Sequence, residues 1–271
     1  MNKFACILVI FGITGSSYAQ VPGFNCDMNN FQSCTNVFAD YLGVSSTNVF
    51  DEMFLFRALY DKFTTGQGVG DVVNLCNQIS NFYTCVTTDQ IRQCMSPLGW
   101  VNQGKSPAQA YINDGTLRQW VFMCGVGLDL FQDPNTYDCI RRTFNNNFNQ
   151  LVDGALYPYM QNIAFDPANA CNYSAQLQMA WTNVFYTSAP CYNDRREYAA
   201  QFVGCAAALE YTSAQFSHCM QQNSCKWVAR WNNPSYLKKI DGVMHLKVVP
   251  YWQKDKYGKL YQTKESWIPL N

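Results

Sequence analysis

The sequence predicts a mainly α-helical fold in which several antiparallel helices are crosslinked by disulfides, with a short basic C-terminal segment after them. Apolar residues recur at three- and four-residue spacing through most of the chain, which is the period of an amphipathic helix. Thirteen cysteines lie in the 271 residues, a number typical of disulfide-rich secreted proteins. Hydrophobic residues make up 48% and aromatic residues 15% of the chain, which is enough for a sizeable core.

Residues 1–19 predict a secretory signal peptide. Lys3 supplies the positive end, residues 4–13 form an apolar run, and the small residues Ser17 and Ala19 favour cleavage before Gln20. The alternative is a membrane anchor, but the apolar run is shorter than the roughly 20 residues that span a bilayer. No later stretch of the sequence is long and apolar enough to span. We therefore expect a secreted, extracellular protein without a transmembrane segment.

The cysteine count agrees with an oxidising compartment. Of the thirteen cysteines, Cys6 lies in the signal peptide, so twelve remain after cleavage. An even number in a secreted chain predicts a complete framework, here six disulfides. The pairing stays open, because twelve cysteines allow on the order of ten thousand pairings. The predicted disulfide residues are Cys26, Cys34, Cys76, Cys85, Cys94, Cys124, Cys139, Cys171, Cys191, Cys205, Cys219 and Cys225.

The apolar stripes place the helices. An irregular leading segment precedes the first of them, and Gly residues at 66, 68 and 70 form a loop between the second and third. The stripes predict helices over residues 34–42, 50–63, 72–86, 107–128, 134–151, 171–185, 198–209 and 213–227.

Local capping signals mark several helix starts. Asn48 followed by Asp51 resembles a capping box for the second helix. Ser106 precedes a proline and stands three residues before a glutamine, which is a strong start signal. Asp133 before Pro134 predicts the next start, and Thr212 or Ser213 is expected to cap the last helix.

The helical pattern ends at Asn233, so we expect a cysteine-rich helical domain over residues 20–233 and a basic tail over residues 234–271. The tail has strand-like composition over residues 245–249 and 259–263, with a plausible turn at 255–258 between them. A small hairpin packed on the domain and a loosely ordered arm remain the two alternatives for it.

Charge is balanced overall but unevenly placed. From Gln20 to Ser235 eleven Lys and Arg stand against sixteen Asp and Glu, a net charge of −5. From Tyr236 onward seven Lys stand against three acids, a net charge of +4. Neither value approaches the strong basic patch of nucleic-acid-binding proteins, so no nucleic-acid partner is expected.

Motifs for catalysis and metal binding are missing from the sequence. A Ser-His-Asp triad or a Cys-His pair must use His218 or His245, because these are the two histidines of the chain. His218 precedes Cys219, but no Asp follows it as in the helix of secreted phospholipases. The sequence has no Gly-x-Ser-x-Gly elbow, His-Glu-x-x-His or Cys-x-x-Cys motif. We expect no catalytic residue, metal or cofactor, and interpret His218 as a structural or surface residue.

The aromatic load has two interpretations. Core packing is the favoured one, and an apolar pocket between helices that holds a lipid or another hydrophobe is the alternative. The residues behind it are Phe50, Phe54, Phe56, Phe63, Trp120, Phe122, Phe131, Trp181, Phe185 and Trp227.

One glycosylation signal is complete. Asn172 is followed by Tyr173 and Ser174, which is an acceptor sequence without proline in the middle. We expect Asn172 to be exposed and glycosylated.

Three blocks of residues carry a resemblance to a known group of domains. They are Leu75-Cys76 with Phe82-Tyr83-Thr84-Cys85 and Cys94, then Tyr111 with Phe122-Met123-Cys124, then Cys139. Residues 26–225 with these blocks resemble the cysteine-rich secreted domains found largely in nematodes, namely the domain of unknown function 19 and the chondroitin proteoglycan 4 type domain. The resemblance implies an extracellular, mostly helical domain without known activity. The sequence departs from a proteoglycan because no Ser is followed by Gly, the dipeptide at which chondroitin attaches.

These observations favour a secreted, non-enzymatic protein that acts by binding in the extracellular space or matrix. Its expected partner is an extracellular protein, a glycan or a hydrophobic ligand. A carrier of lipid or another small hydrophobic ligand is the alternative, and a secreted hydrolase that uses His218 is the least favoured hypothesis.

Overall fold

A computed structural model describes residues 25–192, 196–221, 223, 225, 237–248, 252–254, 256–257, 259–262, 264 and 266–269. The chain divides into two compact units, Met1–Cys225 and Lys226–Asn271. The predicted signal peptide lies outside the described residues. The predicted domain boundary at residue 233 and the end of the predicted helix 213–227 also lie outside them.

The first unit is helical and crosslinked by disulfides, which confirms the predicted fold class. It also contains a π-helical turn, η1 (Val152–Leu156), and two 3-10 turns, η2 (Pro167–Asn169) and η3 (Ser217–Gln221). The α-helices are α1 (Met28–Leu42), α2 (Phe54–Thr65), α3 (Val69–Val86), α4 (Thr88–Met95), α5 (Pro97–Asn102), α6 (Pro107–Cys124), α7 (Val126–Phe131), α8 (Pro134–Asn146), α9 (Phe148–Leu151), α10 (Tyr157–Phe165), α11 (Ala170–Thr187), α12 (Ala189–Tyr192) and α13 (Glu197–Ser213).

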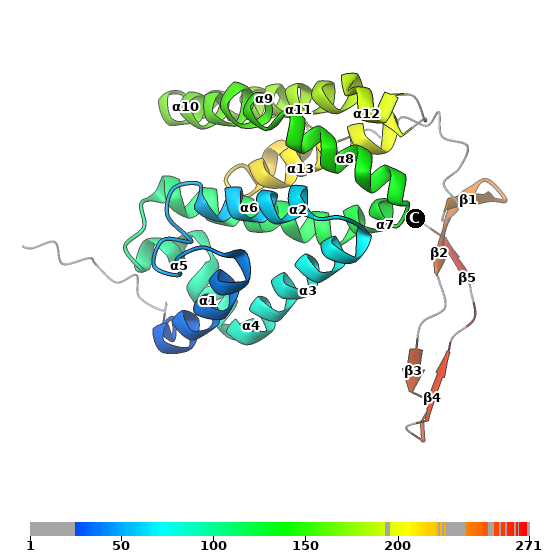
Figure 1. Ribbon diagram of the computed structural model, residues 1–271, viewed down its shortest axis with the longest axis horizontal. Coiled ribbons are helices and arrows are strands. Elements are labelled where there is room, and N and C mark those ends of the chain that lie inside the picture. The colour runs from blue at the N-terminus through cyan, green and yellow to red at the C-terminus, as the bar shows by residue number, and fades with distance from the viewer. Residues whose placement is uncertain are drawn as a thin grey trace, which may run out of the picture. The chain divides into compact units, whose positions relative to one another are not determined.

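The helices of this unit stack in layers (Figure 1). The continuous run α9–η1–α10 lies with α11 at one edge, and α13 packs against α11. Next come α6 against α13 and α2 against α8, and α1 with α3 and α4 forms the opposite edge. α6 and α13 are therefore the central pair.

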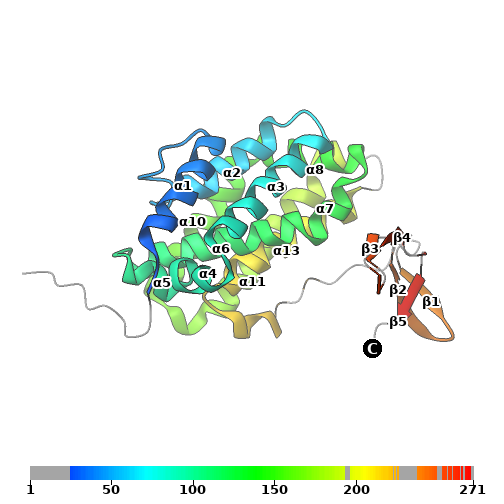
Figure 2. The ribbon, with the colours of Figure 1, turned by 90° about the horizontal axis from the view of Figure 1, so that it is seen from below.

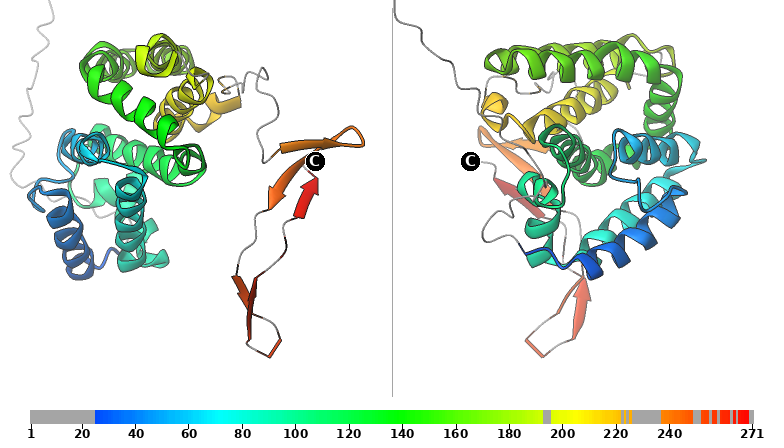
Figure 3. Two further views of the ribbon diagram at one scale, coloured as in Figure 1. Left: turned by 45° about the vertical axis from the view of Figure 1, so that its right-hand side comes forward. Right: turned by 90° about the vertical axis from the view of Figure 1, so that its left-hand side faces the viewer.

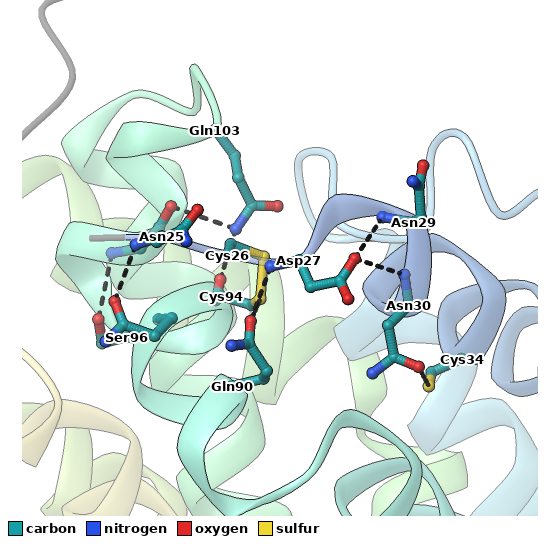
Figure 4. Close-up of a disulfide and its surroundings, with 12 residues drawn as sticks. Asn25, Cys26, Asp27, Asn29, Asn30, Cys34, Gln90, Cys94, Ser96 and Gln103 are labelled. Atoms are coloured by element: carbon teal, nitrogen blue, oxygen red, sulfur yellow. Dashed lines mark hydrogen bonds between the residues drawn. A yellow bond between two sulfur atoms is a disulfide. The ribbon is translucent and has the colours of Figure 1, made fainter. Parts of the chain in front are cut away.

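The first helix begins earlier than predicted. Asp27 is its N-cap, and its carboxylate accepts hydrogen bonds from the backbone N–H groups of Asn29 and Asn30 at 3.1 Å each. Figure 4 shows this cap beside the Cys26–Cys94 disulfide, where Gln90 accepts a 2.7 Å hydrogen bond from the N–H of Asp27. The irregular leading segment therefore ends at residue 27, because a disulfide and a side-chain cap together fix the first turn.

The predicted capping box at Asn48 is wrong. Residues 46–50 form turns, and α2 starts only at Phe54. Val49 is fully buried and Phe50 is 6% exposed, so packing holds this segment in a non-helical conformation. Asp51 forms an ion pair with Lys105 rather than capping a helix.

Of the other predicted helix starts, two are confirmed and one is wrong. The Ser106 hydroxyl accepts from the N–H of Gln109 at the start of α6, and Asp133 caps α8. Thr212 and Ser213 do not begin a helix but lie in the last turn of α13. Their hydroxyls donate to carbonyl groups three residues earlier, which is a helix-interior arrangement.

A π-helical turn joins α9 to α10. η1 covers Val152–Leu156, and Pro158, two residues after its end, has no N–H to continue an α-helix. The wider turn accommodates the proline ring and shifts the register of the helix behind it. Tyr159, Met160 and Ile163 of α10 lie beside residues of α6 and α13.

Small residues allow α13 to approach its neighbours closely. A Cβ on Gly204 would lie 2.5 Å from the ring of Phe185 on α11, and a Cβ on Gly115 of α6 would lie 2.8 Å from the carbonyl oxygen of Tyr211. Between α6 and α13, the buried Gln119 amide donates to the carbonyl of Ala207 at 3.0 Å. The central pair is thus fixed by both packing and a buried hydrogen bond.

The predicted aromatic stripes meet in a filled core. Trp120, Trp181 and Phe185 are at most 1% exposed, whereas Phe54 is 45% exposed and does not belong to it. Phe144 on α8 lies at the centre, with its ring 4.7 Å from Tyr60, 5.9 Å from Phe63, 5.9 Å from Trp181 and 4.8 Å from Phe185, between centroids. Trp227 lies outside the described residues.

The twelve predicted cysteines form six disulfides. They are Cys26–Cys94, Cys34–Cys85, Cys76–Cys124, Cys139–Cys191, Cys171–Cys219 and Cys205–Cys225. The first three close residues 26–124, here called the first half, and the last three close residues 139–225, the second half. No disulfide joins the halves. Figure 3 (left) shows α1–α4 in blue to cyan on one side and α8–α13 in green to yellow on the other.

The halves meet along α6 and α13, a contact that we call the α6–α13 seam. It consists of Gly115, Gln119 and Phe122 on α6 against Tyr211, Ala207 and Phe202 on α13.

The second unit contains β-strands. β1 (Leu237–Ile240) and β2 (Val243–Val248) form a hairpin whose turn, Asp241-Gly242, has positive φ at both residues, and β2 also pairs antiparallel with β5 (Ser266–Pro269). β3 (Trp252–Lys254) pairs with β4 (Leu260–Gln262) around a turn at 256–257. The predicted strands fall on β2 and β4, but these do not pair with each other. The hairpin of β1 and β2 was not predicted, although its Asp241-Gly242 turn is a strong hairpin signal.

Candidate functional site

The two histidines do not lie in a catalytic arrangement within the described part of the chain. His218 is exposed on η3, and its Nε2 lies 3.6 Å from the Sγ of Cys219. The potential metal ligands of Cys171, His218 and Cys219 lie within 4.8 Å of one another, but the two cysteines are joined in a disulfide and offer no thiolate. His245 lies on β2, where its Nδ1 is 3.0 Å from the carbonyl of Val243.

The predicted glycosylation signal lies in the first turns of α11. Asn172 is exposed, as expected, but Ser174 is fully buried. The Ser174 hydroxyl shares a 2.7 Å hydrogen bond with the hydroxyl of Thr212 on α13 and accepts from the Gln178 amide at 3.2 Å. A glycosylating enzyme that contacts both Asn172 and Ser174 can reach them only before α11 packs against α13.

Asn172→Gln is expected to remove the mass of one N-linked glycan while changing the free energy of unfolding by no more than about 0.5 kcal/mol, because Asn172 is exposed. Ser174→Ala should remove the same mass and also lower that free energy by about 1–3 kcal/mol, since the buried Thr212 hydroxyl loses one of its two partners and the Gln178 amide loses its bond to Ser174. Intact-mass measurement and urea unfolding of the secreted proteins check this. Equal stability of the two variants would contradict the structural role of Ser174.

One hollow of the helical unit is a groove of about 560 Å³ along α6. Residues from α3, α4, α6, α7 and α13 line it, and Figure 2 shows α4, α5, α6 and α13 close together on this side. Leu117 and Phe122 from α6 and Met95 from α4 contribute apolar surface. Val121 and Val126 are 54% and 58% exposed at the groove, so an apolar strip faces solvent.

A group of ionisable side chains lies beside this apolar strip. Arg118 and Asp114, one turn apart on α6, form a 2.9 Å ion pair. Burial raises the pKa of Asp114, and Arg118 opposes the shift. Burial, helped by Asp114 and opposed by Arg118, raises the pKa of Tyr83 to about 12, so this phenol stays protonated. The groove therefore offers donors and acceptors next to apolar surface.

Glu210 on α13 is the unusual member of this group. Its side chain is partly buried, and burial raises its pKa while Arg118 lowers it. Among the described residues no donor hydrogen-bonds to its carboxylate, and none forms an ion pair with it. Arg92, exposed at the same groove, likewise has no ion-pair partner there.

Another hollow, smaller than this groove, lies on the other side of α6, between α6, α10 and the end of α13. It measures about 160 Å³, and its walls include Ile112, Met160, Ile163, Tyr159 and Tyr211. Both hollows therefore include residues of α6 and α13, and both lie along the seam between the two disulfide-closed halves. Interfaces between compact parts are common places for binding sites.

None of the helices in the described ranges is long and apolar enough to cross a membrane. Comparison of the chain with known protein families, with curated proteins and with solved structures finds no match in any of the three.

Proposed function

We propose that this chain is a secreted, non-enzymatic protein that binds a partner protein in the extracellular space through the groove along α6. The groove supports this because it combines an exposed apolar strip at Val121 and Val126 with charged groups at its rim. Contiguous exposed apolar surface bordered by polar residues is typical of protein–protein contacts. The six disulfides and the lack of a membrane-spanning helix among the described residues are compatible with the extracellular space.

The charges of the groove indicate the chemistry of the partner. Glu210 is partly desolvated, and Arg118 offsets only part of the cost of ionising it, because its pKa remains raised. A Lys or Arg of the partner, placed beside an apolar side chain on the strip, recovers that cost. We therefore propose a partner segment in which an apolar residue lies near a basic one.

The test uses a photo-crosslinking residue at Val121, with the same residue at Val37 as the matched control. Val37 lies on α1, is 67% exposed and lines none of the hollows described above. In extracellular fluid from the source of the protein, the Val121 label is expected to capture a defined partner that the Val37 label does not. Val126→Asp should abolish this capture, because it places a charge on the apolar strip.

The affinity of the captured partner for Glu210→Gln is expected to fall about tenfold, the usual loss for a charged hydrogen-bond partner. Glu52→Gln, a change of the same kind at a residue outside the groove lining, serves as the control. Capture of the same proteins from both labelled positions, or unchanged affinity of Glu210→Gln, would contradict the proposal.

A carrier function is the second candidate. Most of the aromatic residues that suggested it pack in the core, whereas Phe122 lines the groove along α6 and Phe54 is exposed. The smaller hollow between α6, α10 and α13 is the observation that favours a carrier of small apolar molecules.

A further inference from the structure

We propose that the hollow between α6, α10 and α13 binds a small, uncharged apolar molecule that carries one hydrogen-bond acceptor, such as a carbonyl or ether oxygen. This site is separate from the groove that faces the proposed protein partner. The inference rests on the carrier function proposed above, and a lack of binding at this hollow would leave the partner-binding function unaffected.

The size and the walls of the hollow set the bulk of the ligand. A volume of about 160 Å³ is close to that of engineered apolar cavities of about 150 Å³ that take up benzene. Ile112 from α6 and Met160 and Ile163 from α10 supply apolar contacts. None of the described residues that line the hollow is charged, so a carboxylate or an ammonium group would find no counter-ion. The ligand is therefore neutral.

Tyr159 supplies the first polar group. It is 4% exposed, and its hydroxyl is buried without a hydrogen-bond partner among the described residues. Burial raises the pKa of Tyr159, so the hydroxyl keeps its proton and remains a donor. Buried tyrosine hydroxyls in folded proteins usually have a partner, and an unsatisfied one calls for an explanation.

Tyr211 supplies the second polar group of the hollow. It is 5% exposed, and its hydroxyl contacts the Sδ of Met160 at 3.6 Å, a weak acceptor. Burial raises the pKa of Tyr211, and the nearby phenols of Tyr159 and Tyr157 raise it further. Tyr159 and Tyr211 therefore bring two buried phenol donors to the walls of one hollow, which also include the amide side chain of Gln215. A ligand oxygen placed between the two tyrosine hydroxyls accepts a hydrogen bond from each.

Both phenols are held in place by the fold. The ring of Tyr211 packs over Gly115, where a Cβ would lie 3.2 Å from two ring carbons, and stands perpendicular to Phe56 at 6.3 Å between centroids. Tyr159 follows the π-helical turn that sets the register of α10. Donors fixed before the ligand arrives lose little freedom on binding, which favours affinity.

The test compares acetophenone with α-methylstyrene, two molecules of nearly the same shape that carry C=O and C=CH₂ respectively. Binding to the full secreted chain, with its disulfides intact, is followed through the ¹³C-methyl signals of methionine. Each probe is expected to shift the signal of Met160, which lines the hollow, and not that of Met179, which is 58% exposed on α11.

Tyr159→Phe and Tyr211→Phe should each weaken acetophenone binding about five- to tenfold, and α-methylstyrene binding less than twofold, because only the ketone accepts a hydrogen bond. Ala108→Phe, at an exposed position on the rim, should fill the hollow and abolish binding of both probes. An unshifted Met160 signal with both probes would overturn the site. Equal effects of the tyrosine variants on the two probes would overturn the role of the hydroxyls.

Discussion

Phe144→Ala is expected to lower the free energy of unfolding of the helical unit by about 3–5 kcal/mol, the usual cost of deleting a buried phenylalanine ring. Phe144 is 1% exposed and contacts Tyr60 and Phe63 from the first half as well as Trp181 and Phe185 from the second. Because no disulfide joins the halves, these ring contacts connect them in addition to the α6–α13 seam. The loss should therefore fall on the contact between halves more than on either half.

Urea unfolding measures the free energy, and native-state hydrogen exchange locates the loss. In Phe144→Ala the amides of α11 and α13 are expected to open separately from those of α1 and α3, whereas the parent protein opens both groups together. Phe54→Ala is the matched control, because Phe54 is 45% exposed and should cost less than about 1 kcal/mol. A single shared opening in Phe144→Ala would contradict the proposed coupling.

Gly115→Ala is the second change with a large expected effect, a loss of about 1–3 kcal/mol, as for overpacking a well-filled core. The added Cβ would lie 2.8 Å from the carbonyl oxygen of Tyr211, so the backbones of α6 and α13 must move apart. This movement also stretches the 3.0 Å hydrogen bond from Gln119 to Ala207. The single methyl group thus disturbs the seam along which both hollows lie.

Gly70→Ala provides the control for this substitution. Gly70 lies in the first turn of α3, and a Cβ there meets no atom within 4 Å. Alanine favours a helix over glycine, so this variant should gain about 0.5–1 kcal/mol. Thermal unfolding of the two variants should therefore shift in opposite directions, and a neutral Gly115→Ala would contradict the close approach of α6 and α13.

Local signals in the sequence predicted elements where packing agrees with them. Ser106 and Asp133 start helices as expected because their caps lie on exposed helix ends, where a side chain that accepts from a free N–H decides the outcome. Asn48 does not start a helix, because burial of Val49 and Phe50 fixes a turn that no short window of sequence reveals. Thr212 does not start one either, because its hydroxyl bonds within α13 and to Ser174.

The binding surfaces were not predictable in the same way. The Asp114–Arg118 pair could be recognised from its four-residue spacing on a helix. The unpaired state of Glu210 depends on how α13 packs beside α6, and the neighbouring phenols of Tyr159 and Tyr211 are 52 residues apart in the chain. The same holds for the disulfide pairing, since cysteine positions alone do not limit which helices meet.

The separation of the disulfides into two sets bears on how the chain is made. Cys124, the last cysteine of the first set, leaves the ribosome before Cys139, the first of the second set. Oxidation that keeps pace with synthesis therefore chooses twice among about 15 pairings, instead of once among on the order of ten thousand. The order of the cysteines along the chain thus limits the number of pairings open at each stage of oxidation during synthesis.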